Sequence, residues 1–227
     1  MLGRMASARL VQNVQWLGHA GFLIGIAGKT VYIDPYRSSV GPPADVILIT
    51  HDHFDHFSPE DVERLVRTGT RVIAPASVTE QIRGAAVSIA PGEAVELDAL
   101  EVTAVAAYNT NKLNSDGEPF HPREAGGVGY LLRAGGERLY HSGDTDVIPE
   151  MDQAAGVDIA LLPVSGTYVM TAAEAAEAAR RIEPSLAIPM HWGTVIGSLA
   201  DAEEFKERAS VHVQIPERAT EGGEESG

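Results

Sequence analysis

Three histidines and two aspartates are concentrated in residues 51–56, which read His-Asp-His-Phe-Asp-His. They follow the apolar residues 46–49 and Thr50, a run typical of a strand that is buried on both faces. Histidine and aspartate are usually exposed or paired, so crowding them here costs free energy unless something neutralises them. A divalent cation does so, because imidazole nitrogen and carboxylate oxygen are its ordinary ligands. The cluster therefore predicts a metal site, and a histidine-rich surface turn is the alternative.

The spacing within this cluster offers ligands to two cations. Alternate residues of an extended chain point the same way, so His51 and His53 can share one ion. Asp55 and His56 fall where the chain turns toward a helix, and they can face a neighbouring ion. Two ions roughly 3.5–4 Å apart can hold a bridging water, lower its pKa and bind a leaving oxygen. The chemistry that this arrangement predicts is hydrolysis.

The elements that must position the cluster begin with a first pass of strands and helices. A helix is expected after the cluster, with Ser58 as its N-cap, Pro59 as its first residue and Gly69 at its end. Ser77 and Glu80 form a capping box that predicts another short helix. The expected strands lie at residues 11–16, 21–26, 30–33 and 45–50.

A second, similar pass follows from about residue 91. Thr171 and Glu174 form a capping box for a helix that runs to about residue 182. Residues 108–126 form a long polar loop, which is typical of a functional or a disordered segment. The expected strands lie at residues 101–107, 127–133, 138–141, 158–162 and 185–190, and a last helix at residues 201–209. Strands that alternate with helices in this way predict a layered α/β protein.

Composition and charge narrow the function further. We expect one domain at residues 1–215, followed by a disordered acidic tail at residues 216–227. The net charge of −15 argues against nucleic-acid binding, which needs lysine and arginine, and favours a small-molecule substrate. Cysteine is absent, so histidine, aspartate or glutamate must hold any metal. No stretch approaches the roughly 20 apolar residues of a membrane span, and residues 1–10 do not resemble a signal peptide, so we expect a cytoplasmic protein.

The pattern His-x-His-x-Asp-His after an apolar strand resembles the signature of the metallo-β-lactamase-fold hydrolases. Further segments resemble that family in the same order, at residues 16–20 (WLGHA), 33–35 (IDP), 142–145 (SGDT) and 189–193 (PMHWG). Within the superfamily the chain is most similar to small hydrolases near ascorbate-6-phosphate lactonase and the N-acylphosphatidylethanolamine-cleaving phospholipase D. The resemblance implies a four-layer αβ/βα sandwich, with two mixed β-sheets face to face, helices outside and metals at one edge. It also leaves a homo-oligomer open, because relatives often assemble.

The resemblance implies a ligand set that spans most of the chain. Asp144 matches the carboxylate that bridges both ions, and an acidic turn residue is the alternative. His191 matches the last ligand of the second ion, and a buried core histidine is the alternative. Together with His121, which the family pattern does not supply, the expected ligands are His51, His53, Asp55, His56, His121, Asp144 and His191.

His121 is the point at which this chain departs from the family pattern. Many relatives have a histidine shortly after the strand at residues 101–107, where this chain reads Tyr-Asn-Thr-Asn. His121 is the only histidine of the following loop, so we expect it to replace that ligand. Alternatively, it lines the pocket while Asn109 or water completes the site.

Supporting and catalytic roles fall to a few further residues. His19 and Asp34 match family positions that are close to the metals without usually binding them. Asp34 can accept the outer N–H of a metal-bound imidazole, and His19 can protonate a leaving group or hold a substrate anion. Asp55 is expected to orient the nucleophile. His141 faces away from Asp144 along its strand, so a core or supporting role is expected.

Four residues flank the ligands in the sequence and have open roles. Tyr168 and Trp192 either line the pocket or pack in the core. Lys112 and Arg37 are the nearby cations that could hold a phosphate or carboxylate, although a solvated surface position is the more ordinary one for each.

The sequence thus predicts a dinuclear metal-dependent hydrolase, with Zn²⁺ as the expected ion and Mn²⁺ as the alternative. A bridging hydroxide is expected to attack an ester, a lactone or a phosphodiester of a small molecule. A rival function is that of a di-iron oxidoreductase of the same fold, which is expected to carry a carboxylate in place of His53 and an attached flavin domain. A member that uses metal only for structure is the other alternative.

Overall fold

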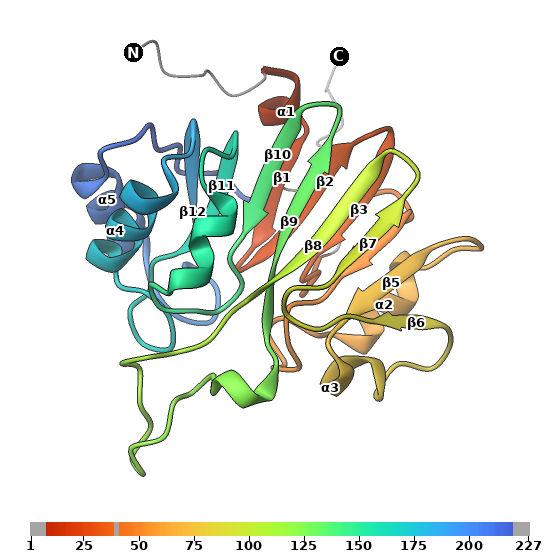
Figure 1. Ribbon diagram of the computed structural model, residues 1–227, viewed down its shortest axis with the longest axis horizontal. Helices are drawn as coiled ribbons and strands as arrows, with labels where there is room; N and C mark the ends of the chain where they lie inside the picture. Colours follow the sequence, from red (N-terminus) through yellow and green to blue (C-terminus); the bar gives the residue numbers. More distant parts are fainter. Residues whose placement is uncertain (1–7, 39–40, 220–227) are drawn as a thin grey trace, which may run out of the picture.

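The computed structural model describes residues 8–38 and 41–219 as two six-stranded sheets that lie face to face. Figure 1 shows α4 and α5 on one side of the sheets and α2 and α3 on the other, which is the predicted four-layer sandwich. The first sheet has the order β1 (Val14–Gly18), β2 (Gly21–Ile26), β3 (Lys29–Ile33), β4 (Val46–Leu48), β5 (Arg71–Ala74), β6 (Ala86–Ser88). The second has the order β12 (Leu186–Met190), β11 (Ile159–Pro163), β10 (Glu137–His141), β9 (Val128–Ala134), β8 (Leu100–Ala106), β7 (Ala94–Leu97).

Both sheets are mixed, and each begins with antiparallel strands and ends with parallel ones. In the first sheet β1, β2 and β3 pair antiparallel, whereas β3 to β6 pair parallel. In the second sheet β7 to β10 pair antiparallel, whereas β10 to β12 pair parallel. Parallel neighbours share the edge at which their carboxyl ends lie, so loops that leave these ends meet.

The helices begin where their capping residues place them. Ser58 accepts a hydrogen bond from the backbone of Asp61 at the start of α2, and Thr171 and Glu174 form the predicted capping box of α4. The described helices are α1 (Ala8–Gln12), α2 (Pro59–Leu65), α3 (Ala76–Thr79), α4 (Ala172–Ile182) and α5 (Leu199–Arg208), with 3₁₀ turns η1 (Arg123–Ala125) and η2 (Pro149–Ala154).

Several predicted local features differ from the structure. Residues 11 and 12, predicted as the start of a strand, belong to α1, and α2 ends at Leu65, before Gly69. The helix α3 has Pro75 as its N-cap and no side-chain capping bond, so Ser77 and Glu80 do not form a capping box. Short helices and helix ends depend on their tertiary neighbours as much as on local residue types, which explains these errors.

The core lies between the sheets, and two hydrogen bonds link them next to the predicted cluster. The buried hydroxyl of Tyr130 on β9 donates to the carbonyl of Ile49 at 2.7 Å. The backbone N–H of Val128 donates to the carbonyl of Thr50 at 3.0 Å. Both bonds join the second sheet to the segment that leads into His51, so they fix the place at which the cluster emerges.

The end of the described chain packs against β1. The side chain of Arg218 donates to the carbonyl of Leu17, and the backbone of Ala219 donates to that of Trp16. The described chain continues to residue 219, past the predicted domain end at residue 215, and that boundary stays a prediction because residues 220–227 of the predicted tail lie outside the described residues.

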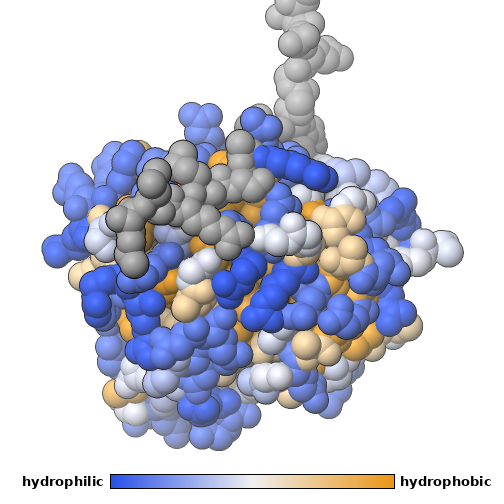
Figure 2. Space-filling model, turned by 45° about the horizontal axis from the view of Figure 1, so that its top comes forward, coloured by the Kyte–Doolittle hydropathy of each residue, from blue (hydrophilic) through white to orange (hydrophobic). Residues whose placement is uncertain are grey.

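Figure 2 shows one face on which hydrophilic side chains predominate and hydrophobic ones lie between them. No helix within residues 8–38 and 41–219 is long and apolar enough to cross a bilayer.

Candidate metal centre

The segments that carry the predicted ligands leave the carboxyl ends of strands. Asp34 follows β3 and residues 51–56 follow β4, which is the parallel neighbour of β3. Asp144 follows β10 and His191 follows β12, in the parallel part of the second sheet. Contacts between these segments show that both sheets present these ends at the same end of the sandwich.

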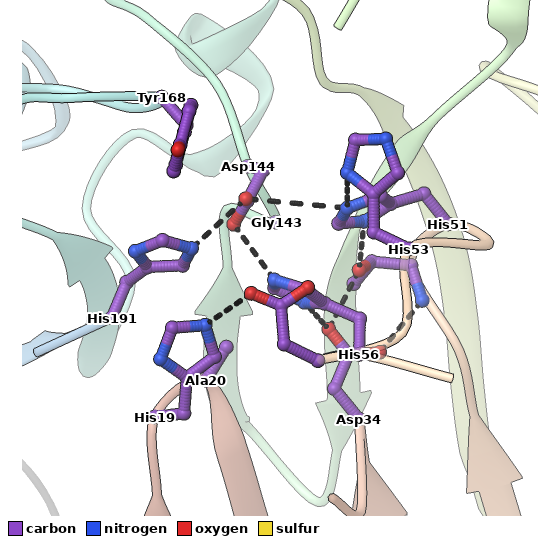
Figure 3. A network of polar contacts seen from close by, with 12 residues as sticks. His19, Ala20, Asp34, His51, His53, His56, Gly143, Asp144, Tyr168 and His191 are labelled. Atoms are coloured by element: carbon purple, nitrogen blue, oxygen red, sulfur yellow. Dashed lines mark hydrogen bonds and ion pairs between the residues drawn. The ribbon is translucent and has the colours of Figure 1, made fainter. Parts of the chain in front are cut away.

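Asp144 lies at the centre of the cluster. Its Oδ1 is 3.3 Å from His56 Nε2, and its Oδ2 is 3.1 Å from His191 Nε2. The same Oδ2 lies 3.4 Å from His121 Nε2 and 4.0 Å from His51 Nε2. Figure 3 shows Asp144 between His191 and His51, so one carboxylate faces ligands from both halves of the chain.

The remaining predicted ligands form two groups around this carboxylate. In each group the candidate ligand atoms all lie within 4.8 Å of one another. The first group contains His51, His53 and His121, and the second contains His19, Asp55, His56 and His191. All seven predicted ligands therefore come together, including His121. His19 also lies in the second group, although it was predicted to lie near the metals without binding them.

Acceptors fix the outer nitrogens of the imidazoles. His56 Nδ1 lies 2.7 Å from Asp34 Oδ2, and His121 Nδ1 lies 2.9 Å from Asn109 Oδ1. Both oxygens can only accept, so each Nδ1 carries a proton and each Nε2 is left facing the centre, where its unprotonated form can bind a cation. Asn109 thus binds His121 rather than replacing it, and Asp34 has the predicted supporting contact with an imidazole.

Hydroxyl groups hold two further imidazoles in the same way. Thr50 Oγ1 lies 2.9 Å from His51 Nδ1 and donates to Asp34 at 2.6 Å. Ser165 Oγ lies 2.9 Å from His191 Nδ1. Consequently, four imidazoles are oriented from outside with Nε2 facing Asp144.

The charges of the cluster perturb its titratable groups. Burial opposes ionisation of Asp144, but the charges of His191 and His56 hold the pKa of its carboxyl well below its usual range. Burial also opposes protonation of His56, but Asp144 and Asp34 raise its pKa well above the usual value. Burial lowers the pKa of His121 to about 4. The carboxylates therefore favour positive charge at the site, while His121 resists protonation and stays available as a ligand. Both properties suit a bound cation.

The donor set fits divalent cations. His56 Nε2 and Asp144 Oδ1 are buried, and apart from their 3.3 Å contact with each other they have no hydrogen-bond partner among the described residues. His53 Nδ1 lies 3.1 Å from both His51 Nε2 and His121 Nε2, so nitrogen atoms face nitrogen atoms. Buried polar atoms without partners are costly, and a cation between them would satisfy these lone pairs.

Backbone geometry indicates that the site is held under local strain. His19, Asp34 and His191 have φ angles of 53°, 45° and 60°, in the left-handed region that residues other than glycine rarely adopt. Gly143, with φ 64°, makes the turn before Asp144, and a Cβ there would lie 2.5 Å from the carbonyl oxygen of Val128. Such conformations concentrate at functional sites.

Packing next to the cluster joins the segment around β1 to the segment that follows β12. The rings of Trp16 and Trp192 stack at 4.6 Å, and His191 donates its backbone N–H to the carbonyl of His19 at 2.8 Å. Trp192 is therefore a packing residue. His141 is fully buried, lies 2.9 Å from the carbonyl of Ala20 and accepts from the backbone of Gly143. It thus contacts the turns next to His19 and Asp144, and its supporting role stays a prediction.

The loop at residues 108–126 is tied down beside the site. Asp146 accepts from the backbone of Thr110 and of Asn111, and it forms a 3.3 Å ion pair with Lys112. Lys112 also contacts Glu174 of α4 at 2.7 Å. Lys112 is therefore a mostly buried tether, and the expectation of a solvated surface position is wrong for it.

A cavity of about 290 Å³ opens beside the cluster and exposes a subset of it. His53, Asp55 and His191 line this cavity, whereas His19 is fully buried behind Asp55, with its Nε2 2.9 Å from Asp55 Oδ2. A larger cavity of about 480 Å³ between α2 and β5 contains none of the candidate ligands. The size of a cavity therefore does not by itself identify the candidate active site.

Several further residues that shape the site are not among those predicted from the sequence. Thr50 and Ser165 orient imidazoles, and Phe54 and Phe120 line the cavity. For Thr50 a signal was available, because a hydroxyl at the end of an apolar strand directly before a ligand is well placed to bind that ligand. Ser165 has no comparable signal, since its contact with His191 joins distant parts of the chain.

The sandwich fold and the His/Asp cluster at its strand ends define a class, the metallo-β-lactamase-fold hydrolases. Residues 13–191 match the family model of the Beta-lactamase superfamily domain, and the chain belongs to this family.

Relatives agree with this assignment. The chain is 35% identical over 211 residues to a UPF0173 metal-dependent hydrolase of Methanopyrus kandleri, covering 86% of this chain and 90% of the relative. It is similar to a crystal structure assigned to a metal-dependent hydrolase of Parabacteroides distasonis, with a TM-score of 0.79, 30% identity, and 89% and 91% of the two chains covered. CmlA, a diiron β-hydroxylase of Streptomyces venezuelae, shares the fold at a TM-score of 0.68 and 14% identity, with 89% of this chain and 52% of CmlA covered. The chain is thus a metal-dependent hydrolase of the beta-lactamase superfamily.

Proposed function

We propose that this hydrolase holds two divalent cations, with Zn²⁺ as the expected ion and Mn²⁺ as the alternative, and cleaves an ester-type bond of a small molecule. The observation that carries the proposal is the position of Asp144, whose two oxygens face imidazoles of both ligand groups. The first ion would be held by His51, His53, His121 and Asp144, and the second by Asp55, His56, His191 and Asp144. When bound, such ions lower the pKa of a water molecule and stabilise the negative charge that develops on the substrate.

Asp55 and His19 would act together on the side of the second group. Burial opposes ionisation of Asp55, but its hydrogen bond with His19 and the charge of His56 lower the pKa of Asp55 to about 2. Asp55 is therefore an acceptor that can orient the attacking water. Because His19 does not line the cavity, we place it behind Asp55, which it holds in position, rather than against the leaving group.

The rival redox function has less support. CmlA shows that this fold also occurs in a diiron enzyme. In the present chain His53 occupies the position at which that chemistry is expected to use a carboxylate, and imidazole suits zinc as well as iron. Iron-dependent visible absorption of the purified protein would favour the rival.

The proposal is tested with Asp144→Ala and, as a matched control, Asp52→Ala, which removes an exposed carboxylate from the same region. We expect Asp144→Ala to lose at least one ion per chain and to reduce ester turnover by at least roughly 100-fold, whereas Asp52→Ala keeps both. Metal content is measured by elemental analysis after dialysis, and turnover with chromogenic esters in added Zn²⁺ or Mn²⁺. Full activity of metal-free Asp144→Ala protein would refute the proposal.

A further inference from the structure

Apolar and aromatic side chains form the outer wall of the cavity beside the metal centre. Phe54, Tyr168 and Val195 are 67%, 37% and 41% exposed, and all three line the cavity. They are half of the large hydrophobic side chains that the described residues expose. The ring of Phe120 meets that of Tyr168 edge to face at 4.8 Å, and Figure 3 shows Tyr168 beside Asp144 and His191. Exposed apolar groups that gather at a cavity mark a ligand site.

The same wall has no cationic side chain. Among the described residues, neither lysine nor arginine lines the cavity. The ammonium of Lys112 is bound by Glu174 and Asp146, and the guanidinium of Arg123 is bound by Glu150 at 2.6 Å. These cations are neutralised by their own partners. Protein sites for phosphate or carboxylate groups generally supply arginine or lysine.

We infer that the substrate is an uncharged ester or lactone whose apolar chain or ring lies against Phe54, Phe120, Tyr168 and Val195, and that phosphodiesters and anionic esters are disfavoured. This inference rests on the proposed hydrolytic function and selects one substrate class within it. An apolar group gains free energy when it leaves water for this wall. A carboxylate or phosphodiester group at the same place would lose hydration without gaining a protein cation.

Two esters that differ only at the far end of the acyl group test the inference. They are 4-nitrophenyl pentanoate and the mono-4-nitrophenyl ester of glutaric acid, which carries a carboxylate where the first has a methyl group. Hydrolysis of each consumes one water, breaks the acyl C–O bond and releases the carboxylate, 4-nitrophenol and a proton. We expect kcat/KM of the metal-loaded protein to be about tenfold or more higher for the pentanoate. Bis(4-nitrophenyl) phosphate should be a poorer substrate than the pentanoate.

A binding measurement separates this inference from the proposed chemistry. Pentananilide and glutaranilic acid repeat the same pair as amides, and calorimetry measures their binding to metal-free protein, in which no ion can attract the carboxylate. We expect pentananilide to bind about tenfold tighter. If no ester is hydrolysed but pentananilide binds tighter, the preference of the wall for an uncharged group stands, whereas the proposed ester hydrolysis is refuted. Binding of neither amide, or tighter binding of glutaranilic acid, would overturn the inference.

A charge placed in the wall provides the matched variant. Val195→Lys introduces the missing cation at the mouth of the cavity, and Leu199→Lys introduces the same charge at an exposed leucine of α5 outside it. We expect Val195→Lys to shift the kcat/KM ratio of the two esters toward the glutarate ester by about tenfold, and Leu199→Lys to leave the ratio unchanged. An equal shift in both variants, or none in Val195→Lys, would count against the proposed wall.

Discussion

At the scale of single residues, Asp34 orients imidazoles of both ligand groups through hydrogen bonds to their outer nitrogens, directly or through Thr50. It is completely buried, and its carboxylate accepts from His56 Nδ1 and from the hydroxyl and backbone N–H of Thr50. Thr50 in turn binds His51 Nδ1. One carboxylate thus orients His56 directly and His51 through a hydroxyl, so its charge influences one imidazole of each predicted ion.

Asp34→Asn should therefore weaken metal binding at both positions. The amide can place an N–H where the carboxylate accepted, which disturbs the tautomer of His56. We expect each metal affinity to fall by roughly 10–100-fold, as measured by competition with a chromophoric chelator. Asp52→Asn is the control, because Asp52 is exposed and carries the same charge. Equal affinities in Asp34→Asn and Asp52→Asn would contradict the supporting role.

The same residues show how far the candidate site follows from sequence. His51 and His53 could be placed together because they are only two residues apart, although the structure brings them together from a turn after β4 and not from a strand. The inclusion of His121 was a prediction by elimination, and the structure confirms its place in the cluster, although its role as a ligand stays a prediction. The contact between Ser165 and His191 could not be predicted, since it depends on how β11 and β12 pair.

At the scale of elements, the loop at residues 108–126 and the helix α4 hold each other in place. Glu174 caps α4 through Thr171 and also binds Lys112 and Asn111 of the loop. Local signals predicted the capping box correctly, because such a box involves residues only three apart. The ion pair with Lys112 joins residues 62 positions apart, so no local pattern indicates it.

Glu174→Gln should reveal this tether through its pH dependence. Burial opposes ionisation of Glu174, but hydrogen bonds from Lys112, Thr171 and Asn111 lower its pKa from 4.5 to about 2. The ionised form therefore stabilises the fold fully above pH 4.5, and this stabilisation is lost as the pH falls toward 2. We expect the free energy of unfolding of Glu174→Gln to be about 1 kcal/mol lower than that of the parent protein at pH 6, and the difference to shrink by pH 3.

Urea unfolding in the presence of a chelator measures this difference without a contribution from metal release. Glu177→Gln is the control, because Glu177 lies on the same helix and pairs with Arg180 at an exposed position. Its effect should be smaller at pH 6. A Glu174→Gln difference that is constant or grows on acidification would contradict the tether.

At the scale of the whole molecule, the metal centre joins the two sheets. Residues 51–56 belong to the first sheet's segment, whereas Asp144 and His191 follow strands of the second. The alternation of strands and helices predicted the layers. The meeting of the two sheets' strand ends at one site depends on their face-to-face packing, which only the family resemblance predicted. Cations held across this junction bind the folded chain and find no preformed site in the unfolded one.

Metal binding should therefore raise the melting temperature. At a free metal concentration about 100 times the dissociation constant, one site adds about 2.7 kcal/mol to the free energy of unfolding. For a domain of this size that corresponds to a rise of about 5–10 °C, measured by calorimetry with Zn²⁺ and with a chelator. Asp144→Ala, which lacks the carboxylate shared by both ligand groups, should show little of this rise. An equal melting temperature with and without bound metal, with occupancy verified by elemental analysis, would show that the cations do not join the sheets.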